Sequence, residues 1–139
     1  MKPIIMTEHL FAVDTNILIY LEGNDTHKRR VAEELLSDNP VISSQVISEF
    51  INVMRRLRNV PKKQLIIETV SLFRYCPIVP TSHSVLQRAA QLIARYDFQI
   101  FDSIIVASAV ESGCEILYSE DMQQNLIVDR QLTIVNPFL

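Results

Sequence analysis

Short apolar segments alternate with longer amphipathic segments along the chain. The short segments are rich in β-branched residues and are bounded by polar residues or proline, which is typical of strands buried on both faces of a sheet. They cover residues 11–13, 41–42, 78–79, 116–118 and 133–135. We therefore predict five strands.

The longer segments repeat their apolar residues every three or four positions, which indicates amphipathic helices. They cover residues 44–58, 62–75, 82–97 and 102–113. Ser44 and Ser82 are suited to be helix N-caps, and Pro61 is placed to open a helix. The last segment is apolar on nearly every side and stops at Gly113, so we expect a central, buried helix there.

The alternation of strands and helices predicts the fold class. Connections between parallel strands through a helix are right-handed and place helices on both faces of the sheet. The chain has 139 residues, of which 48% are hydrophobic, which is enough for one domain with its own core. We therefore expect a single α/β domain with three layers, in which helices flank a central parallel sheet.

Composition indicates the compartment but not the substrate. Two isolated cysteines, Cys76 and Cys114, fit buried and reduced thiols in the cytoplasm. Residues 1–9 turn polar too early for a signal peptide, and no stretch approaches the roughly 20 apolar residues of a membrane helix. We expect a cytoplasmic protein without a membrane partner. The net charge of −3 neither indicates nor excludes a nucleic acid substrate.

Four acidic residues stand at related places in the predicted elements. Asp14 directly follows the first strand, and Glu49 lies in the first turns of the helix after the second strand. Asp102 opens the buried helix, and Asp121 follows the strand 116–118 by a few residues. Each acid alone has a structural explanation as a helix cap, a partner of the helix dipole or a solvated loop residue. Three of them are expected at the edge of the sheet where ligands bind in open parallel folds, and Glu49 is expected one helical turn further in.

Four carboxylates at one edge would repel one another and would need raised pKa values unless cations were bound. Mg²⁺ and Mn²⁺ prefer oxygen ligands and keep water molecules for substrate phosphates. Such a site can generate a nucleophilic water and stabilise charge on a phosphodiester. The four acids therefore predict a divalent metal site.

The sequence around these acids resembles the PIN domain family. The segment Val13–Leu18 is similar to the opening motif of that family, and Ser48–Phe50 is similar to the second. The segment Phe101–Ala109 resembles the third motif, and Tyr118–Asp121 resembles the fourth. The order and spacing of the motifs agree over almost the whole chain. The compact size is most similar to the VapC-type toxins of toxin–antitoxin pairs.

The resemblance implies a single PIN domain over residues 1–139 that hydrolyses RNA with Mg²⁺ or Mn²⁺ and leaves a 5′-phosphate. It assigns metal coordination, directly or through water, to Asp14, Glu49, Asp102 and Asp121. It assigns supporting roles to Ser119, Thr15 and Asn16. The third motif usually has alanine where this chain has Ser103, a small change that should not displace the neighbouring carboxylate. Asp97 and Glu120 fit the motifs less well, and we interpret them as solvated.

The densest basic stretch holds five of the 13 lysine and arginine residues. These residues are Arg55, Arg56, Arg58, Lys62 and Lys63. They are candidates for contacts with RNA phosphates, and the alternative is a solvated helix end whose cations complement the helix dipole.

The segment Ile17–Leu21 has more apolar residues than one buried helix face requires. The resemblance implies that the early helices help to form a groove for an antitoxin and that homodimers are common. The same residues can instead pack in the core. Partner binding therefore stays open at this point, although an amphipathic partner helix would suit such a groove.

Three other functions compete with a toxin ribonuclease. A phospho-acceptor receiver domain needs an acid pair after the first strand and a lysine after the last, but Thr15 and Asn16 follow Asp14 and no lysine occurs in 127–139. An RNA-processing PIN nuclease without an antitoxin has the same sequence features as a toxin. A PIN module that has lost catalysis and only binds RNA or assembles is the third alternative.

Overall fold

The computed structural model describes residues 10–139, so the expectation for the first nine residues lies outside the described part. One sheet has the strand order β1-β4-β6-β5, and β2 pairs with β3 in a second ladder. A parallel bridge between Ala12 and Val41 joins the two ladders at β1. The strands are β1 (Phe11–Val13), β2 (Ile42–Ser43), β3 (Ile78–Val79), β4 (Ile116–Tyr118), β5 (Ile127–Val128) and β6 (Leu132–Val135).

The central strands are parallel, as predicted, but the edge of the sheet is not. β4 pairs in parallel with β1 and with β6, and β2 pairs in parallel with β3. β5 pairs antiparallel with β6, so the sheet is mixed at that edge. The hairpin has two residues with positive φ in its turn, Asp129 and Arg130. The prediction of a central parallel sheet is therefore confirmed, and the antiparallel edge strand β5 is an addition that the sequence pattern did not predict.

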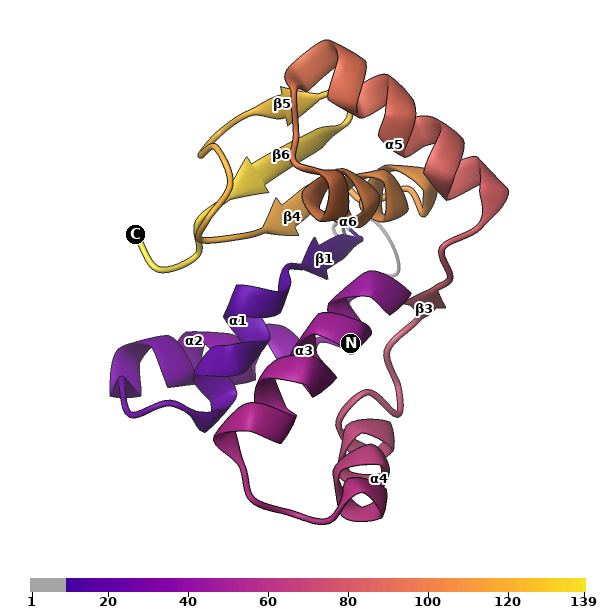
Figure 1. Cartoon of the computed structure of the whole chain (residues 1–139). Helices are drawn as coiled ribbons and strands as arrows, with labels where there is room; N and C mark the ends of the chain where they lie inside the picture. Colours follow the sequence, from indigo (N-terminus) through magenta and orange to yellow (C-terminus); the bar gives the residue numbers. More distant parts are fainter. Residues whose placement is uncertain (1–9) are drawn as a thin grey trace, which may run out of the picture.

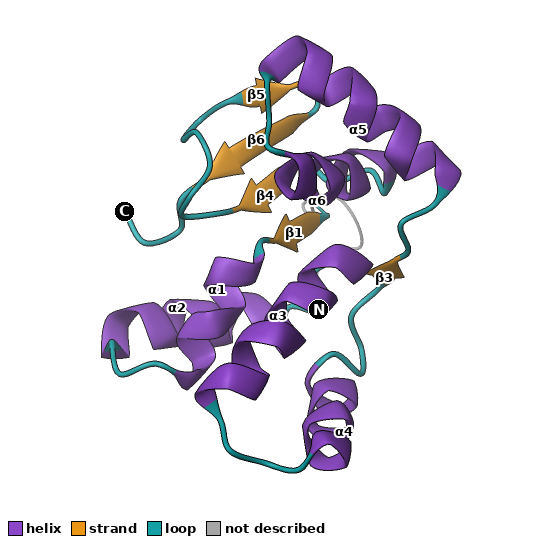
Figure 2. Ribbon diagram, viewed as in Figure 1, coloured by secondary structure: helices purple, strands orange, loops and turns teal. Residues whose placement is uncertain are grey.

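Helices pack around the sheet and complete the three-layer α/β/α arrangement (Figures 1 and 2). The helical segments are α1 (Thr15–Ile19), the 3₁₀ turn η1 (Tyr20–Glu22), α2 (Thr26–Ser37), α3 (Ser44–Leu57), α4 (Lys62–Leu72), α5 (His83–Tyr96) and α6 (Ile100–Glu111). α6 packs against β2, β4, α3 and most extensively α5. Every residue from Ser103 to Val110 is buried, which confirms the prediction of a central helix. In the described part, no helix is long and apolar enough to cross a membrane.

The ends of the helices follow local hydrogen bonding. The Ser82 hydroxyl accepts from Val85 N and caps α5, as predicted. α3 is capped one residue earlier than predicted, because the Ser43 hydroxyl accepts the bond from Val46 N at 3.1 Å. Gly113 has a φ of +83° just beyond α6, a conformation that favours glycine after a helix end.

The apolar start of the chain's first helix mostly joins the core. Ile17 and Leu18 are buried, and Leu21 is partly buried. α2, which the sequence pattern did not predict, packs against η1 and α1. Both cysteines are buried and unpaired, which agrees with the expected reduced thiols.

The register of β1 and β4 sets the position of the first acid. Val13 lies opposite Tyr118, so both strands end at the same level of the sheet. Asp14 N donates to the carbonyl oxygen of Tyr118 at 2.9 Å, and Ser119 N donates to that of Val135 at 2.9 Å. Asp14 and Ser119 therefore leave the sheet side by side at its carboxyl edge.

Candidate functional site

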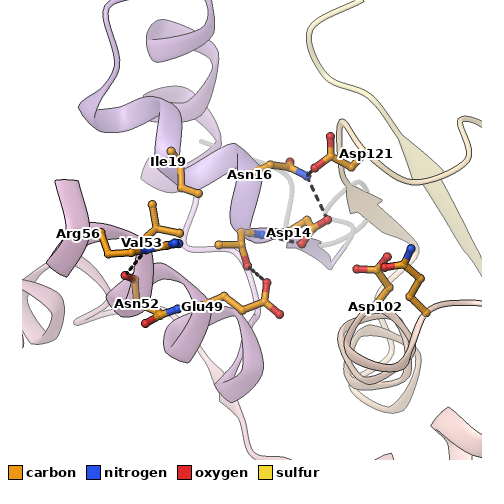
Figure 3. Close-up of a pocket in the computed structure, with 11 residues that line it drawn as sticks. Asp14, Asn16, Ile19, Glu49, Asn52, Val53, Arg56, Asp102 and Asp121 are labelled. Carbon is orange, nitrogen blue, oxygen red and sulfur yellow. Dashed lines mark hydrogen bonds between the residues drawn. The ribbon is translucent and has the colours of Figure 1, made fainter.

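A cavity of about 490 Å³ opens at the carboxyl edge of β1 and β4. All four predicted acids line it: Asp14, Glu49, Asp102 and Asp121. They come from four separate parts of the chain, namely the end of β1, α3, the first turn of α6 and the loop after β4 (Figure 3). The remaining lining residues are Thr15, Asn16, Ile19, Asn52, Val53, Arg56 and Gln99. The cavity has the size of an ordinary small-ligand site.

Asp14 is the most enclosed of the four acids. Its side chain is 5% exposed and caps α1, because Oδ1 accepts from Thr15 N at 2.7 Å. Its other oxygen, Oδ2, accepts from the Ser119 hydroxyl at 2.8 Å and from Asn16 Nδ2 at 3.2 Å. The helix-cap explanation is therefore correct, and the same carboxylate also faces the cavity.

Burial makes the ionised form of Asp14 unfavourable. Desolvation raises the pKa of Asp14 from 3.8 to about 6, although the bonds from Ser119 and Thr15 oppose the rise. The charges of Asp102 and Glu49 raise it further. Burial also raises the pKa of Asp102, and the charges of Glu49 and Asp121 add to that effect. The acids thus lie close enough to disfavour one another's charge, which is the condition that a bound cation relieves.

Two supporting residues connect Asp14 to the other acids. The Thr15 hydroxyl donates to Glu49 Oε1 at 2.8 Å, and Gln45 Nε2 donates to Glu49 Oε2 at 2.9 Å. Asn16 Nδ2 donates to Asp121 Oδ2 at 3.0 Å as well as to Asp14. Thr15 and Asn16 therefore orient carboxylates that come from α3 and from the loop after β4.

Ser119 and Ser103 differ in what their hydroxyls contact. Ser119 is fully buried, donates to Asp14 and accepts from Met122 N at 3.3 Å, so it fixes the start of the loop that carries Asp121. The Ser103 hydroxyl is buried and donates to the Ile100 carbonyl oxygen within α6. Serine in place of the usual alanine is thus accommodated inside the helix and leaves the Asp102 carboxylate at the cavity.

Glu120 is not a freely solvated residue, and that prediction was wrong. Lys28 Nζ, from α2, donates to Glu120 Oε2 at 2.5 Å, and the Tyr20 hydroxyl donates to Glu120 Oε1. The bond from Lys28 is the main cause of a lowered pKa for Glu120. Glu120 N also donates to Asn16 Oδ1 at 3.2 Å. These bonds join α2 and η1 to the loop next to Asp121.

The donor set fits Mg²⁺ or Mn²⁺ in its chemistry. All four acids supply carboxylate oxygens, and no described side chain donates a hydrogen bond to the half-buried Asp102 carboxylate. Within residues 10–139, however, no group of three or more acidic, histidine or cysteine side chains is arranged to hold a metal ion. Mg²⁺ usually binds through one or two carboxylates and keeps several waters, so it does not require such a group.

The basic stretch is divided between different surroundings. Arg56 lines the cavity, whereas Arg55 Nε donates to Asn52 Oδ1 at 3.0 Å. Arg58 forms an ion pair with Glu68 at 2.8 Å. Lys62 and Lys63 begin α4, are exposed and do not line the cavity. Of the five basic candidates, the structure therefore brings only Arg56 to the acids.

A family model described as "PIN domain" matches residues 11–127 of the chain. The chain belongs to the PIN domain family. The match covers the four acids and both layers of helices described above. No curated protein sequence matches the chain significantly.

Solved structures share the fold of this PIN domain. A toxin–antitoxin complex from Klebsiella pneumoniae contains a chain that is 23% identical, with a TM-score of 0.68 over 92% of this chain and 97% of that one. VapC20 of Mycobacterium tuberculosis, a sarcin–ricin loop cleaving toxin, is 16% identical, with a TM-score of 0.63 over 80% and 89%. VapBC2 of Rickettsia felis, bound to promoter DNA, contains a chain that is 18% identical, with a TM-score of 0.60 over 91% and 99%. At these identities the likeness establishes the fold.

Several lining residues of the PIN domain's cavity were not predicted from the sequence. Asn52 and Arg56 stand three and seven positions after Glu49 on α3, a spacing that places them on one helix face. Arg56 was predicted only as a candidate for RNA contacts and Asn52 was not predicted at all, whereas helical periodicity counted from Glu49 could have identified both as cavity residues. Gln99, at the cap of α6, carries no comparable signal.

Proposed function

We propose that this PIN domain is a divalent-metal-dependent endoribonuclease that acts as the toxin of a type II toxin–antitoxin pair. The observation that carries the proposal is a buried carboxylate, Asp14, in a cavity shared with three other acids. Because its pKa is raised to about 6, Asp14 favours neutralisation by a proton or a cation. Near neutral pH a divalent cation is the partner that an all-oxygen donor set prefers.

The chain's own residues would hold and orient the metal and the RNA. Asp14, Glu49, Asp102 and Asp121 would supply oxygens to Mg²⁺ or Mn²⁺, in part through water. When bound, such an ion activates water and stabilises charge on a phosphodiester, so the 2′-hydroxyl is not needed and the product carries a 5′-phosphate. Hydrogen bonds from Thr15 hold Glu49, and those from Ser119 and Asn16 hold Asp14, so the acids are oriented before substrate binds.

The proposed partner is a cognate antitoxin, and the proposed setting is a homodimer in the cytoplasm. The fold neighbours from Klebsiella pneumoniae and Rickettsia felis are parts of toxin–antitoxin assemblies, which supports this proposal. A shallow cavity of about 390 Å³, lined by Leu21, Leu36 and Leu72 among others, offers an apolar surface beside η1 and α2 for a partner helix.

RNA cleavage by the purified chain tests the enzymatic proposal. We expect cleavage of single-stranded RNA in Mg²⁺ or Mn²⁺, loss of cleavage in EDTA, and products with 5′-phosphates. Asp14→Asn should lower the rate by at least about 100-fold, because the carboxylate charge is removed. Cleavage that persists in EDTA or in Asp14→Asn would contradict the proposed mechanism.

Expression of the chain in a bacterial host separates the toxin from the alternatives. Growth arrest that Asp14→Asn relieves, together with copurification of a short protein encoded beside the chain, supports a toxin. Cleavage in vitro without growth arrest would instead support an RNA-processing nuclease. RNA binding without cleavage in either divalent ion would support a silent PIN module.

A further inference from the structure

One face of α3 runs along the cavity beyond the acids. Glu49, Asn52, Val53 and Arg56 follow the spacing i, i+3, i+4 and i+7, and all four line the cavity. Seven residues of α-helix advance about 10 Å along the axis. The cavity is therefore a trough that begins at the carboxylates and ends two turns later at a cation.

The chemistry of the trough changes along its length. Asp14, Glu49 and their acidic neighbours occupy one end, and Ile19 of α1 and Val53 of α3 present partly buried apolar groups beside them. Arg56 stands at the other end, and Figure 3 shows it on the opposite side of the site from Asp102. An acidic end, an apolar middle and a cationic end follow one another in this order.

Arg56 is available to an anion. Among residues 10–139, no acidic side chain lies within ion-pair distance of Arg56, whereas Lys28, Arg58 and Arg88 all have acidic partners. Its one described hydrogen bond runs from Nε to the Asn52 carbonyl oxygen at 3.3 Å, within its own helix. That bond directs the side chain along α3 and leaves both terminal nitrogens of the guanidinium without a described partner.

We propose that Arg56 binds the phosphate next to the scissile phosphate of a single-stranded RNA, with Ile19 and Val53 against the nucleoside between them. This inference rests on the ribonuclease function proposed above. If the scissile phosphate is held by cations at the acids, the adjacent phosphate of the same strand lies along the trough. There a guanidinium can bind a phosphate through two donors. The apolar middle accepts a base face or ribose, and base faces are accessible in unpaired RNA but stacked in a duplex.

A phosphate-neutralisation scan tests this assignment. The substrates are one single-stranded RNA in which a single phosphate at a time is a neutral methylphosphonate, with a 2′-O-methyl group at that nucleotide for stability. For the wild-type chain we expect kcat/KM to fall about 3- to 10-fold at one position adjacent to the cut, mainly through KM. In Arg56→Gln this penalty should vanish, while the block at the scissile position remains.

Arg55→Gln is the matched control. It removes the same positive charge from the neighbouring residue, whose side chain does not line the cavity. A second readout is independent of cleavage: the salt dependence of anisotropy for a labelled 10-nucleotide RNA in EDTA. The slope of log K against log salt should become shallower by about 0.7 in Arg56→Gln and by less in Arg55→Gln.

The outcomes are distinguishable. A wild-type chain that cuts no RNA in either divalent ion removes the proposed function and this inference with it. Cleavage that depends on Asp14 but keeps the adjacent-phosphate penalty and the salt slope in Arg56→Gln overturns the inference alone. Efficient cleavage of duplex RNA, at a rate equal to that of the single strand, overturns it as well.

Discussion

Replacing Asp14 with asparagine is expected to stabilise the metal-free protein while it abolishes activity. The folded chain raises the pKa of Asp14 from 3.8 to about 6, mainly because burial desolvates the carboxylate. The folded state therefore favours the neutral form of Asp14 more than the unfolded state does. The contribution of this proton to the free energy of unfolding is fully present below about pH 4. As the pH rises through 6, the folded protein must ionise a buried group, and that stability is lost.

The size of the effect follows from the difference between the two pKa values. A difference of about two pKa units corresponds to about 3 kcal/mol in the free energy of unfolding above pH 6. Asparagine avoids this loss, but an amide NH₂ in place of Oδ2 can accept neither the bond from Ser119 nor that from Asn16, which costs about 1 kcal/mol. We therefore expect Asp14→Asn to be more stable than wild type by about 2 kcal/mol at pH 7.5.

Urea denaturation in EDTA at several pH values between 4 and 8 measures this difference. The difference in unfolding free energy between Asp14→Asn and wild type should increase between about pH 4 and pH 6 and stay constant above pH 6. Asp38→Asn removes the same charge at an exposed helix end and controls for the substitution itself. Added Mg²⁺ should raise the unfolding free energy of wild type more than that of Asp14→Asn, because it binds the folded carboxylate. Parallel stability curves for wild type and Asp14→Asn would refute the reasoning.

Three further substitutions test other parts of the structure. Lys28→Met removes the cation that holds Glu120, so kcat for RNA should fall about 10-fold with little change in KM, and Lys28→Arg should recover part of the loss in steady-state kinetics. Gly113→Ala forces a side chain into a φ of +83° and should lower the unfolding free energy by about 1 kcal/mol in urea, whereas unchanged stability would argue against that backbone requirement. Leu117→Ala, at a fully buried position of β4, should cost about 2–5 kcal/mol, and a loss under 1 kcal/mol would mean that β4 is not central to the core.

The elements that bury most of their apolar residues could be predicted from the sequence, whereas α2 and β5, which bury little, could not. β1, β4 and α6 are buried on most sides, so their apolar runs stand out. β5 has only two residues, and Ile127 is 59% exposed, so it has no comparable pattern. α2 buries only Ala32 among its 12 residues, which leaves its sequence almost as polar as a loop. Burial favours detection but is not the only signal, because β3 was predicted from its apolar pair although Ile78 is 44% exposed.

The candidate site shows the same division. Asp14 and Asp121 follow β1 and β4. Because the carboxyl ends of parallel strands meet at one edge of a sheet, their positions were sufficient to predict that they share a cavity. The pairing of Glu120 with Lys28 joins residues 92 positions apart and depends on how α2 packs, which no local pattern encodes. The sequence therefore predicted the four acids and the nearby hydroxyl and amide residues Ser119 and Asn16, but not the contacts of Lys28 and Tyr20 with Glu120.

The charges of the site connect its acidic end with its cationic end at Arg56. A cluster of carboxylates with raised pKa values destabilises the metal-free fold, and neutralising the cluster with a proton would remove the metal ligands. A divalent cation relieves the repulsion, and coordination positions that the carboxylates leave open can accept phosphate oxygens. Arg56, two helical turns away and without an acidic partner among the described residues, attracts a second phosphate. Two cationic positions separated by the apolar pair Ile19 and Val53 favour an extended chain of phosphates over a single anion, and this is the charge pattern of an RNA strand.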